Sequence, residues 1–223
     1  MAKDLFEHLQ KFVTPRRLEK FDEVLENRTR YLTIVLEDIY QSQNASAVLR
    51  SCDCFGIQDV NVIENKNVFD VNVDVAMGSS KWLNVNKFNS GQDNTLEAIK
   101  TLKNQGYRII ATSPHAKDKM IDKLDINCGK IALVFGTELT GISDIVRENA
   151  DEFVKVPMYG FTESFNISVC AALSLYELTK RIHNSNVNWN LSEEEKKIIK
   201  MEWLKRSIKS SDDIIKRFLE SNK

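Results

Sequence analysis

Three short polar segments contain the side chains of this sequence that could do chemistry. The segments are residues 44–50, 135–141 and 157–168. The first has an asparagine and an arginine, the second a glutamate between two glycines, and the third a serine and an asparagine. An arginine can grip a phosphate through its planar fork, and the other groups can orient a ligand. Because open α/β proteins place their sites at strand ends and helix starts, these segments predict one composite site.

The common glycine-rich fingerprints of nucleotide sites do not fit these segments. No Gly-x-Gly-x-x-Gly follows the first expected strand, residues 31–36, which argues against a dinucleotide site and the usual Rossmann methyltransferase arrangement. Gly136 and Gly141 have the spacing of a P-loop, but Ile142 stands where its lysine belongs. No Gly-x-Ser-x-Gly elbow is present and no histidine lies inside a motif, which argues against acyl transfer by a serine triad.

Alternating apolar runs and helical patterns predict an α/β fold with a mostly parallel sheet and helices on both faces. Strands are expected over residues 31–36, 60–63, 82–85, 108–111, 130–135 and 153–156. Helices are expected over residues 44–55, 95–104 and 166–183, with a short one from about residue 143. Asn44 is expected to cap the first of these helices, and Gly56 to end it.

Helical extensions are expected on both sides of this α/β core. Residues 3–28 have helical spacing with a break at Thr14-Pro15, where Thr14 can cap a second helix. Residues 184–188 have the composition of a linker, and helices are expected from Ser192 and Ser211. The expected organisation is therefore an N-terminal extension 1–30, a core 31–183 and a C-terminal extension 184–223.

The composition is that of an ordinary globular protein. The 223 residues are 42% apolar and 28% charged, with a formal net charge of −1. No apolar run approaches the roughly 20 residues that a membrane span requires, and the N-terminus is charged, so a cytoplasmic location and no membrane partner are expected. The basic residues of the last forty positions could form a solvated helix face or a patch that binds phosphate, and both interpretations stay open.

The four cysteines have no spacing that suits a metal knuckle. Cys52 and Cys54 are two residues apart and have no partner pair. All four are expected to be buried free thiols, and no metal is expected.

The three segments together resemble the SpoU–TrmH family of RNA ribose 2'-O-methyltransferases, in the SPOUT superfamily. That family has an Asn followed two helical turns later by an Arg, which here are Asn44 and Arg50. Its second motif, Phe-Gly-x-Glu-x-x-Gly at a strand end, is matched by residues 135–141. Its third motif, a Pro ending a strand and then Ser-x-Asn-x-Ser, is matched by Pro157 and residues 164–168. All marker positions are filled, and the resemblance covers about residues 31–183.

The resemblance implies a C-terminal trefoil knot, a homodimer with its active site near the interface, and S-adenosylmethionine as cofactor. In the family the adenine is recognised largely by main chain. By position, that role would belong to Thr112, Gly136, Val156 and Phe165.

The resemblance also implies a catalytic set. By position it consists of Arg50, Asn44, Glu138, Ser164 and Asn166. Arg50 is the position often described as the base, although a guanidinium, which rarely gives up its proton, is better suited to gripping the RNA phosphate. Asn44, Ser164 and Asn166 would also suit a helix start, and Glu138 is expected to orient backbone or neighbouring groups.

The extensions favour a tRNA substrate. Short helical arms, with Thr14-Pro15-Arg16-Arg17-Leu18 near the start, resemble the branch of the family that methylates guanosine 18 in the tRNA D-loop. Trp203, Lys205 and Arg206 could contact phosphates, or Trp203 could pack the C-terminal arm onto the core. Two alternatives remain: 2'-O-methylation of ribosomal RNA, and a non-catalytic RNA-binding protein on the same fold.

Overall fold

The computed structural model describes residues 2–114, 119–137 and 140–221. Contacts divide the chain into two compact units: Thr29–Trp189, which we call the core unit, and Met1–Arg28 with Asn190–Lys223, which we call the terminal unit. No helix in the described ranges is both long and apolar enough to cross a membrane.

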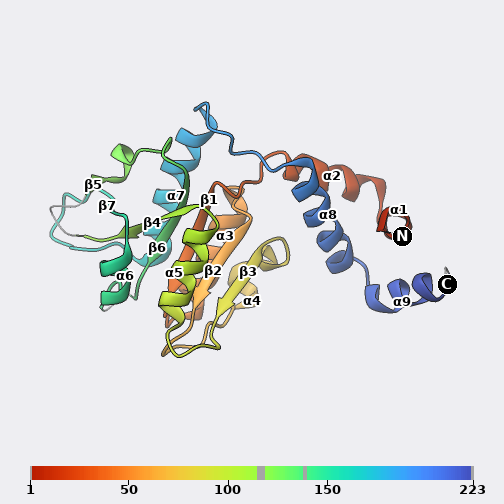
Figure 1. Cartoon of the computed structure of the whole chain (residues 1–223), viewed down its shortest axis with the longest axis horizontal. Coiled ribbons are helices and arrows are strands. Elements are labelled where there is room, and N and C mark those ends of the chain that lie inside the picture. The colour runs from red at the N-terminus through yellow and green to blue at the C-terminus, as the bar shows by residue number, and fades with distance from the viewer. Residues whose placement is uncertain (1, 115–118, 138–139, 222–223) are drawn as a thin grey trace. The chain divides into compact units, whose positions relative to one another are not determined.

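The core unit is built on one parallel sheet (Figure 1). Its strands in the described residues are β1 (Leu32–Glu37), β2 (Asp59–Ile63), β3 (Asn84–Phe88), β4 (Tyr107–Thr112), β5 (Lys119–Met120), β6 (Lys130–Phe135) and β7 (Glu152–Lys155). They lie in the order β3-β2-β1-β6-β4-β7-β5, and every neighbouring pair is parallel. The predicted parallel α/β fold is confirmed, whereas β5, of only two residues, was not predicted.

Helices cover both faces of this sheet (Figure 1). They are α3 (Ser42–Cys54), α4 (Val73–Ala76), α5 (Asn94–Asn104), α6 (Asp144–Asn149) and α7 (Ile167–His183), with 3₁₀ turns η1 (Ser79–Lys81) and η2 (Ile121–Lys123). Apolar side chains of α3 and α7 form one cluster with Ile34 and Leu36, and those of α5 and α6 form another with Val35. Because strand side chains alternate between faces, β1 is buried on both sides.

The start of α3 differs from the prediction. The helix begins at Ser42 with Gln41 as its N-cap, so the expectation that Asn44 caps it is wrong. The physical reason is that the Asn44 side chain is used elsewhere: its Nδ2 donates to Gln41 Oε1, and its Oδ1 accepts from Asn166 Nδ2. The predicted end is confirmed, since Gly56 follows the helix with a φ of 74°.

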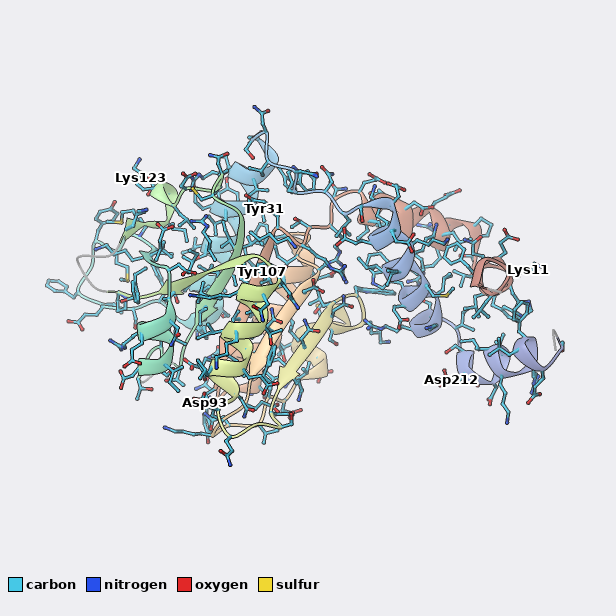
Figure 2. The ribbon with its side chains drawn as sticks, in the orientation of Figure 1. Lys11, Tyr31, Asp93, Tyr107, Lys123 and Asp212 are labelled. Carbon is cyan, nitrogen blue, oxygen red and sulfur yellow. The ribbon has the colours of Figure 1, made fainter. Side chains whose placement is uncertain are left out.

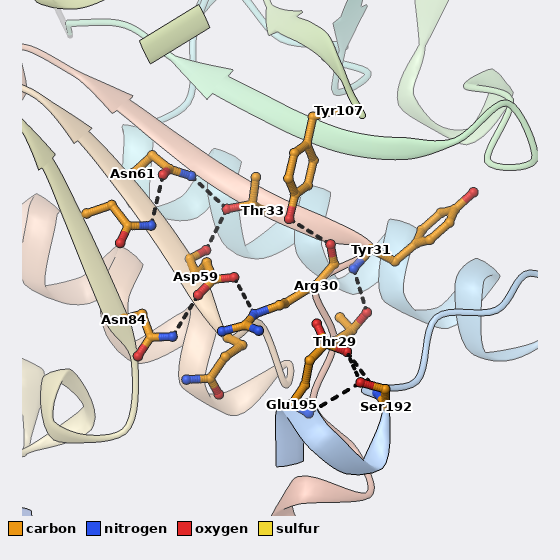
Figure 3. Close-up of polar contacts among 12 residues, drawn as sticks. Thr29, Arg30, Tyr31, Thr33, Asp59, Asn61, Asn84, Tyr107, Ser192 and Glu195 are labelled. Carbon is orange, nitrogen blue, oxygen red and sulfur yellow. Dashed lines mark hydrogen bonds and ion pairs between the residues drawn. The ribbon is translucent and has the colours of Figure 1, made fainter. Parts of the chain in front are cut away.

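A ladder of polar side chains crosses β1, β2 and β3 (Figure 3). Asp59 accepts from Arg30 Nε at 2.8 Å and from Asn84 Nδ2 at 2.8 Å. The buried Thr33 hydroxyl donates to the Asp59 carbonyl at 2.6 Å and accepts from buried Asn61 Nδ2 at 3.0 Å. Each of these buried polar groups therefore has a partner, which is the condition for placing them inside a sheet.

Two tyrosines fix irregular main chain in the core unit (Figure 2). Tyr31 donates its hydroxyl to the carbonyl of Ile126 at 2.6 Å, and Tyr107 donates to the carbonyl of Arg30 at 2.8 Å. Burial is the largest influence on Tyr31 and raises its pKa above the usual value, so its phenol stays a neutral donor.

The terminal unit consists of helices from both ends of the chain. They are α1 (Ala2–Gln10), α2 (Pro15–Leu25), α8 (Glu193–Ser207) and α9 (Ser211–Ser221). Thr14 caps α2 by accepting from the Arg17 amide, and Ser192 caps α8 through a capping box with Glu195 (Figure 3), as predicted. Trp203 is buried, and its ring packs against that of Phe21 within the terminal unit, with the ring centroids 5.5 Å apart.

Acidic residues of α2 and of the turn after it neutralise part of the basic face of α8. Lys196 pairs with Glu26 at 2.7 Å, and Lys200 pairs with Asp22. Two of the basic residues of the C-terminal extension are thereby engaged within the terminal unit.

A buried carboxylate at the end of β1 holds three elements of the core unit together. Glu37 is 2% exposed. It accepts hydrogen bonds from Thr95 Oγ1 at 2.8 Å, from Ser143 Oγ at 2.7 Å and from the Ser143 amide at 2.9 Å. These bonds tie β1 to the first turn of α5 and to the N-cap of α6.

Replacement of Glu37 by alanine is expected to lower the free energy of unfolding by about 2–4 kcal/mol, because one donor of buried Thr95 and two donors of half-buried Ser143 lose their acceptor. Urea unfolding followed by circular dichroism measures this change. E148A, at an exposed position of α6, serves as the control and should change stability by less than about 0.5 kcal/mol. Equal stabilities of the two variants would contradict the role assigned to Glu37.

Candidate functional site

A cavity of about 560 Å³ lies at the carboxyl ends of β4, β6 and β7, beside the start of α7. Its walls come from residues 112–114, 135–137, 140–142, 154–156 and 163–167. Its volume lies within the roughly 300–1,000 Å³ that small-molecule sites occupy, and the carboxyl edge of a parallel sheet is where such sites form. The second and third polar segments of the sequence therefore meet at one ligand-sized space.

The four residues expected to face a cofactor all line this cavity: Thr112, Gly136, Val156 and Phe165. The Thr112 hydroxyl donates to the carbonyl of Val134 at 2.9 Å, so its side chain is already engaged. At these four positions the side chains offer few free polar groups, so any polar contact that these residues make with a ligand would come mainly from their main chain.

The turn after β6 requires glycine at position 136. A Cβ built on Gly136 would lie 2.1 Å from the Gly141 carbonyl oxygen, far inside van der Waals contact. Thr137 and Gly141 exchange two backbone hydrogen bonds, of 2.9 and 3.0 Å, which close the turn on itself. The turn is consequently held against the cavity by its own backbone.

The segment between β7 and α7 contributes several residues to the cavity wall. Among the described residues, residues 156–165 make no backbone–backbone hydrogen bond. Backbone N–H and C=O groups need partners, and those of this segment are available to side chains, solvent or a ligand. This arrangement suits a ligand that is recognised through main-chain groups.

Asn166 connects this cavity to α3. It lines the cavity and caps α7, where its Oδ1 accepts from the Ser168 amide at 2.9 Å and from Ser168 Oγ at 2.6 Å. Its Nδ2 donates to Oδ1 of buried Asn44 at 3.0 Å. The first and third polar segments are therefore joined directly by a side-chain hydrogen bond.

The other expected catalytic residues are placed differently. Ser164 lines the cavity and is exposed. Arg50 is exposed on α3, is not part of the cavity wall, and makes no hydrogen bond or ion pair within the described ranges. Glu138 lies outside the described residues. The core unit of one chain thus brings Asn44, Ser164 and Asn166 toward the cavity, but not Arg50.

Several cavity residues were not found from the sequence. They are Arg147, Lys155 and Cys170. Burial raises the pKa of the Cys170 thiol to about 11, so it is neutral at physiological pH and is no nucleophile. None of these positions belongs to a motif, and only the fold brings them to the cavity.

The expectation that all four cysteines are buried is wrong. Cys52 is buried in the packed face of α3, but Cys54 at the end of that helix and Cys128 in the turn before β6 are exposed. Among the described residues, no cluster of His, Cys, Asp and Glu has the arrangement of a metal site.

Comparisons with known proteins define the class to which this fold and cavity belong. The model of the SpoU rRNA Methylase family matches residues 31–176. The chain belongs to this family, which confirms the resemblance read from the three segments.

The relatives are similar over nearly their whole lengths. The chain is 46% identical to the tRNA (guanosine(18)-2'-O)-methyltransferase of Borreliella burgdorferi, over 91% of this chain and 90% of that protein. It is 30% identical to the protein of the same name from Aquifex aeolicus, over 93% and 95%. The crystal structure of the A. aeolicus TrmH/SpoU tRNA modifying enzyme matches with a TM-score of 0.76 at 31% identity, over 87% of this chain and 98% of that one.

The bond between Asn44 and Asn166 can be measured by a double-mutant cycle. N166A is expected to lower the free energy of unfolding by about 1–2 kcal/mol, since it removes a helix cap and one hydrogen bond. The stability lost in the double variant N44A/N166A should be smaller than the sum of the losses in N44A and N166A, by about 0.5 kcal/mol or more. Chemical unfolding of the four proteins gives the cycle, and strict additivity would contradict a direct bond.

Proposed function

We propose that this protein transfers a methyl group from S-adenosylmethionine to the ribose 2'-hydroxyl of guanosine 18 in the D-loop of tRNA. The 46% identity along 91% of the chain to a relative named tRNA (guanosine(18)-2'-O)-methyltransferase carries this proposal. The relative's length is also matched almost completely, so the comparison concerns the whole protein and not a shared domain alone.

We propose that the cavity at the carboxyl edge of the sheet holds the cofactor. The main chain around Thr112, Gly136, Val156 and Phe165 would bind its adenine. Support comes from the cavity's volume and from residues 156–165, which make no backbone–backbone hydrogen bond within the described ranges. When bound, S-adenosylmethionine supplies a methyl group on a positively charged sulfur.

We assign Arg50 to gripping the RNA phosphate beside the reacting ribose. An exposed guanidinium with its donors unengaged in the described ranges has the geometry for a bidentate phosphate contact. A guanidinium keeps its proton in proteins and has no acceptor atom, which argues against proton removal by this side chain. Holding the hydroxyl in an aligned position can itself lower a barrier by about 7–11 kcal/mol in favourable cases, so positioning is a sufficient role.

The remaining motif residues would order this arrangement. Asn166 and Ser164 lie at the cavity wall, on the side where α7 begins, and would orient the ribose next to the cofactor. Asn44, bonded to Asn166, would fix the position of α3 and so of Arg50. We retain Glu138 as a residue that orders the turn after β6.

We further propose that the protein works as a cytoplasmic homodimer. Val169, Leu173 and Tyr176 are exposed apolar side chains at helical spacing on one face of α7, and exposed Phe165 lies just before them. A second copy that covers this face would stand close to the cavity, because the neighbouring face of α7 contributes Ile167 and Cys170 to the cavity wall.

We also propose the trefoil knot of the family. The strand order is the supporting observation, because β6 inserts between β1 and β4, and β7 inserts between β4 and β5. In the proposed knot, the chain after β7 would thread the loops around these strands before α7 begins.

The function is tested by incubating the protein with labelled S-adenosylmethionine and separate tRNA and ribosomal RNA pools. Label in tRNA that maps to guanosine 18 is the expected result. Label in ribosomal RNA alone would favour the alternative substrate, and no label in either pool would favour a non-catalytic RNA-binding protein.

In the same assay R50A should lose turnover by about 100-fold or more, while the Kd for S-adenosylmethionine stays within about twofold, because the phosphate grip is separate from the cofactor cavity. K100A, which removes an exposed cation on α5, is the control and should keep its turnover. Equal turnover in R50A and the unchanged protein would overturn the role of Arg50.

The proposed dimer face is tested with one charge. L173D places a carboxylate on the apolar face of α7, where Leu173 is 40% exposed, and should convert the dimer to a monomer in sedimentation or light scattering. L219D is the matched control, since Leu219 on α9 is also 40% exposed. A monomeric unchanged protein, or a dimer that survives L173D, would contradict this interface.

A further inference from the structure

Three side-chain amides form a continuous series of hydrogen bonds from the cavity to the start of α3. Asn166 Nδ2 donates to Asn44 Oδ1 at 3.0 Å, and Asn44 Nδ2 donates to Gln41 Oε1 at 3.1 Å. Asn166 lines the cavity, Asn44 is buried, and Gln41 is exposed. The series therefore leads from a cavity wall through the protein to its surface.

The direction of this series is set at one end. The amide of Ser168 can only donate, and it donates to Asn166 Oδ1 at 2.9 Å. Asn166 must then turn its NH₂ group toward Asn44, and Asn44 must turn its own NH₂ group toward Gln41. An amide that receives a hydrogen bond on its oxygen presents its nitrogen elsewhere, so Gln41 turns its NH₂ group away from Asn44.

The surroundings of Gln41 favour RNA as the acceptor of a hydrogen bond from its NH₂ group. Among the described residues, Gln41 Nε2 donates no hydrogen bond, and Gln41 is exposed. The adjacent Tyr40 is 76% exposed, which offers an aromatic face on which a base can stack. Both follow β1, whose Leu36 pairs with Phe135 of β6, so they lie at the same sheet edge as the cavity.

We propose that Gln41 is a substrate-binding residue whose Nε2 donates a hydrogen bond to an acceptor oxygen of the RNA, with its Oε1 held by Asn44. This inference rests on the proposed function. It assigns two separate tasks to the two ends of one amide: the oxygen receives the bond that orders the series, and the nitrogen contacts the substrate.

Two substitutions separate these tasks. Q41E keeps an oxygen that accepts from Asn44 but has no N–H to donate, whereas Q41K keeps outward N–H donors but has no acceptor for Asn44. If the outward donor binds RNA, the Kd for tRNA in filter binding and the KM for tRNA should rise at least about tenfold in Q41E. Both values should stay within about threefold of the unchanged protein in Q41K.

Matched variants at Gln43 remove the effect of charge alone. Gln43 is exposed in the same first turn of α3, and its only described contact is with Ser42 Oγ at 3.5 Å. Q43E and Q43K introduce the same charges two residues away from Gln41. Each Gln41 variant is therefore compared with the Gln43 variant of the same charge, at one fixed salt concentration.

The outcomes are distinct. Weaker RNA binding in Q41E than in Q43E, with Q41K equal to Q43K, supports the proposal. Weaker binding in Q41K than in Q43K, or no difference within either pair, would overturn it. The Kd for S-adenosylmethionine reports that each variant is folded. Absence of methylation by the unchanged protein would overturn the proposed function separately, because the binding comparison does not require turnover.

Discussion

The hydrogen bond between Asn166 and Asn44 joins two helices whose contributing residues lie 122 positions apart in the chain. Both helices pack on the same face of the sheet, and their apolar side chains share one cluster. Apolar contacts of this kind hold the helices together but specify little about their rotation and displacement. A directional bond between two amides at their starts supplies that information. The cavity wall at α7 and the exposed arginine of α3 are thus placed relative to each other by one polar contact.

Burial of the sheet on both faces sets the second constraint. Strands such as β1 have no exposed face on which polar groups could stand, so reactive side chains are restricted to the loops at the strand ends. Those loops must then be ordered without the help of a large apolar core. Glu37 meets this need next to the turn after β6, since its buried carboxylate fixes Ser143 at the far end of that turn. The structural hydrogen bonds of Glu37 therefore lie next to the candidate site at the same edge of the sheet.

The sequence predicted the elements well where a local pattern decides them, as in the apolar run of β6 or the capping box of Ser192. The prediction failed where the role of a side chain depends on a residue far away in the sequence. Asn44 has the residue type of a cap, but its side chain is engaged by Asn166, which no local pattern reveals. The motif residues at the cavity were found from their types and order, whereas Arg147 and Cys170 reach it only through the fold. The separation of Arg50 from the cavity wall likewise depends on which side of α3 faces outward.

The turn at Gly136 restricts how the cavity could be redesigned to accept a bulkier alkyl donor. One wall is backbone packed against backbone, and even a methyl group has no room there. Variation in shape must therefore come from across the space, where Val156, Met158 and Phe165 line the cavity. That segment has no backbone pairing among the described residues, so changes of side-chain volume there disturb no ladder. Directed libraries would be placed on this wall, with Gly136 and Gly141 left unchanged.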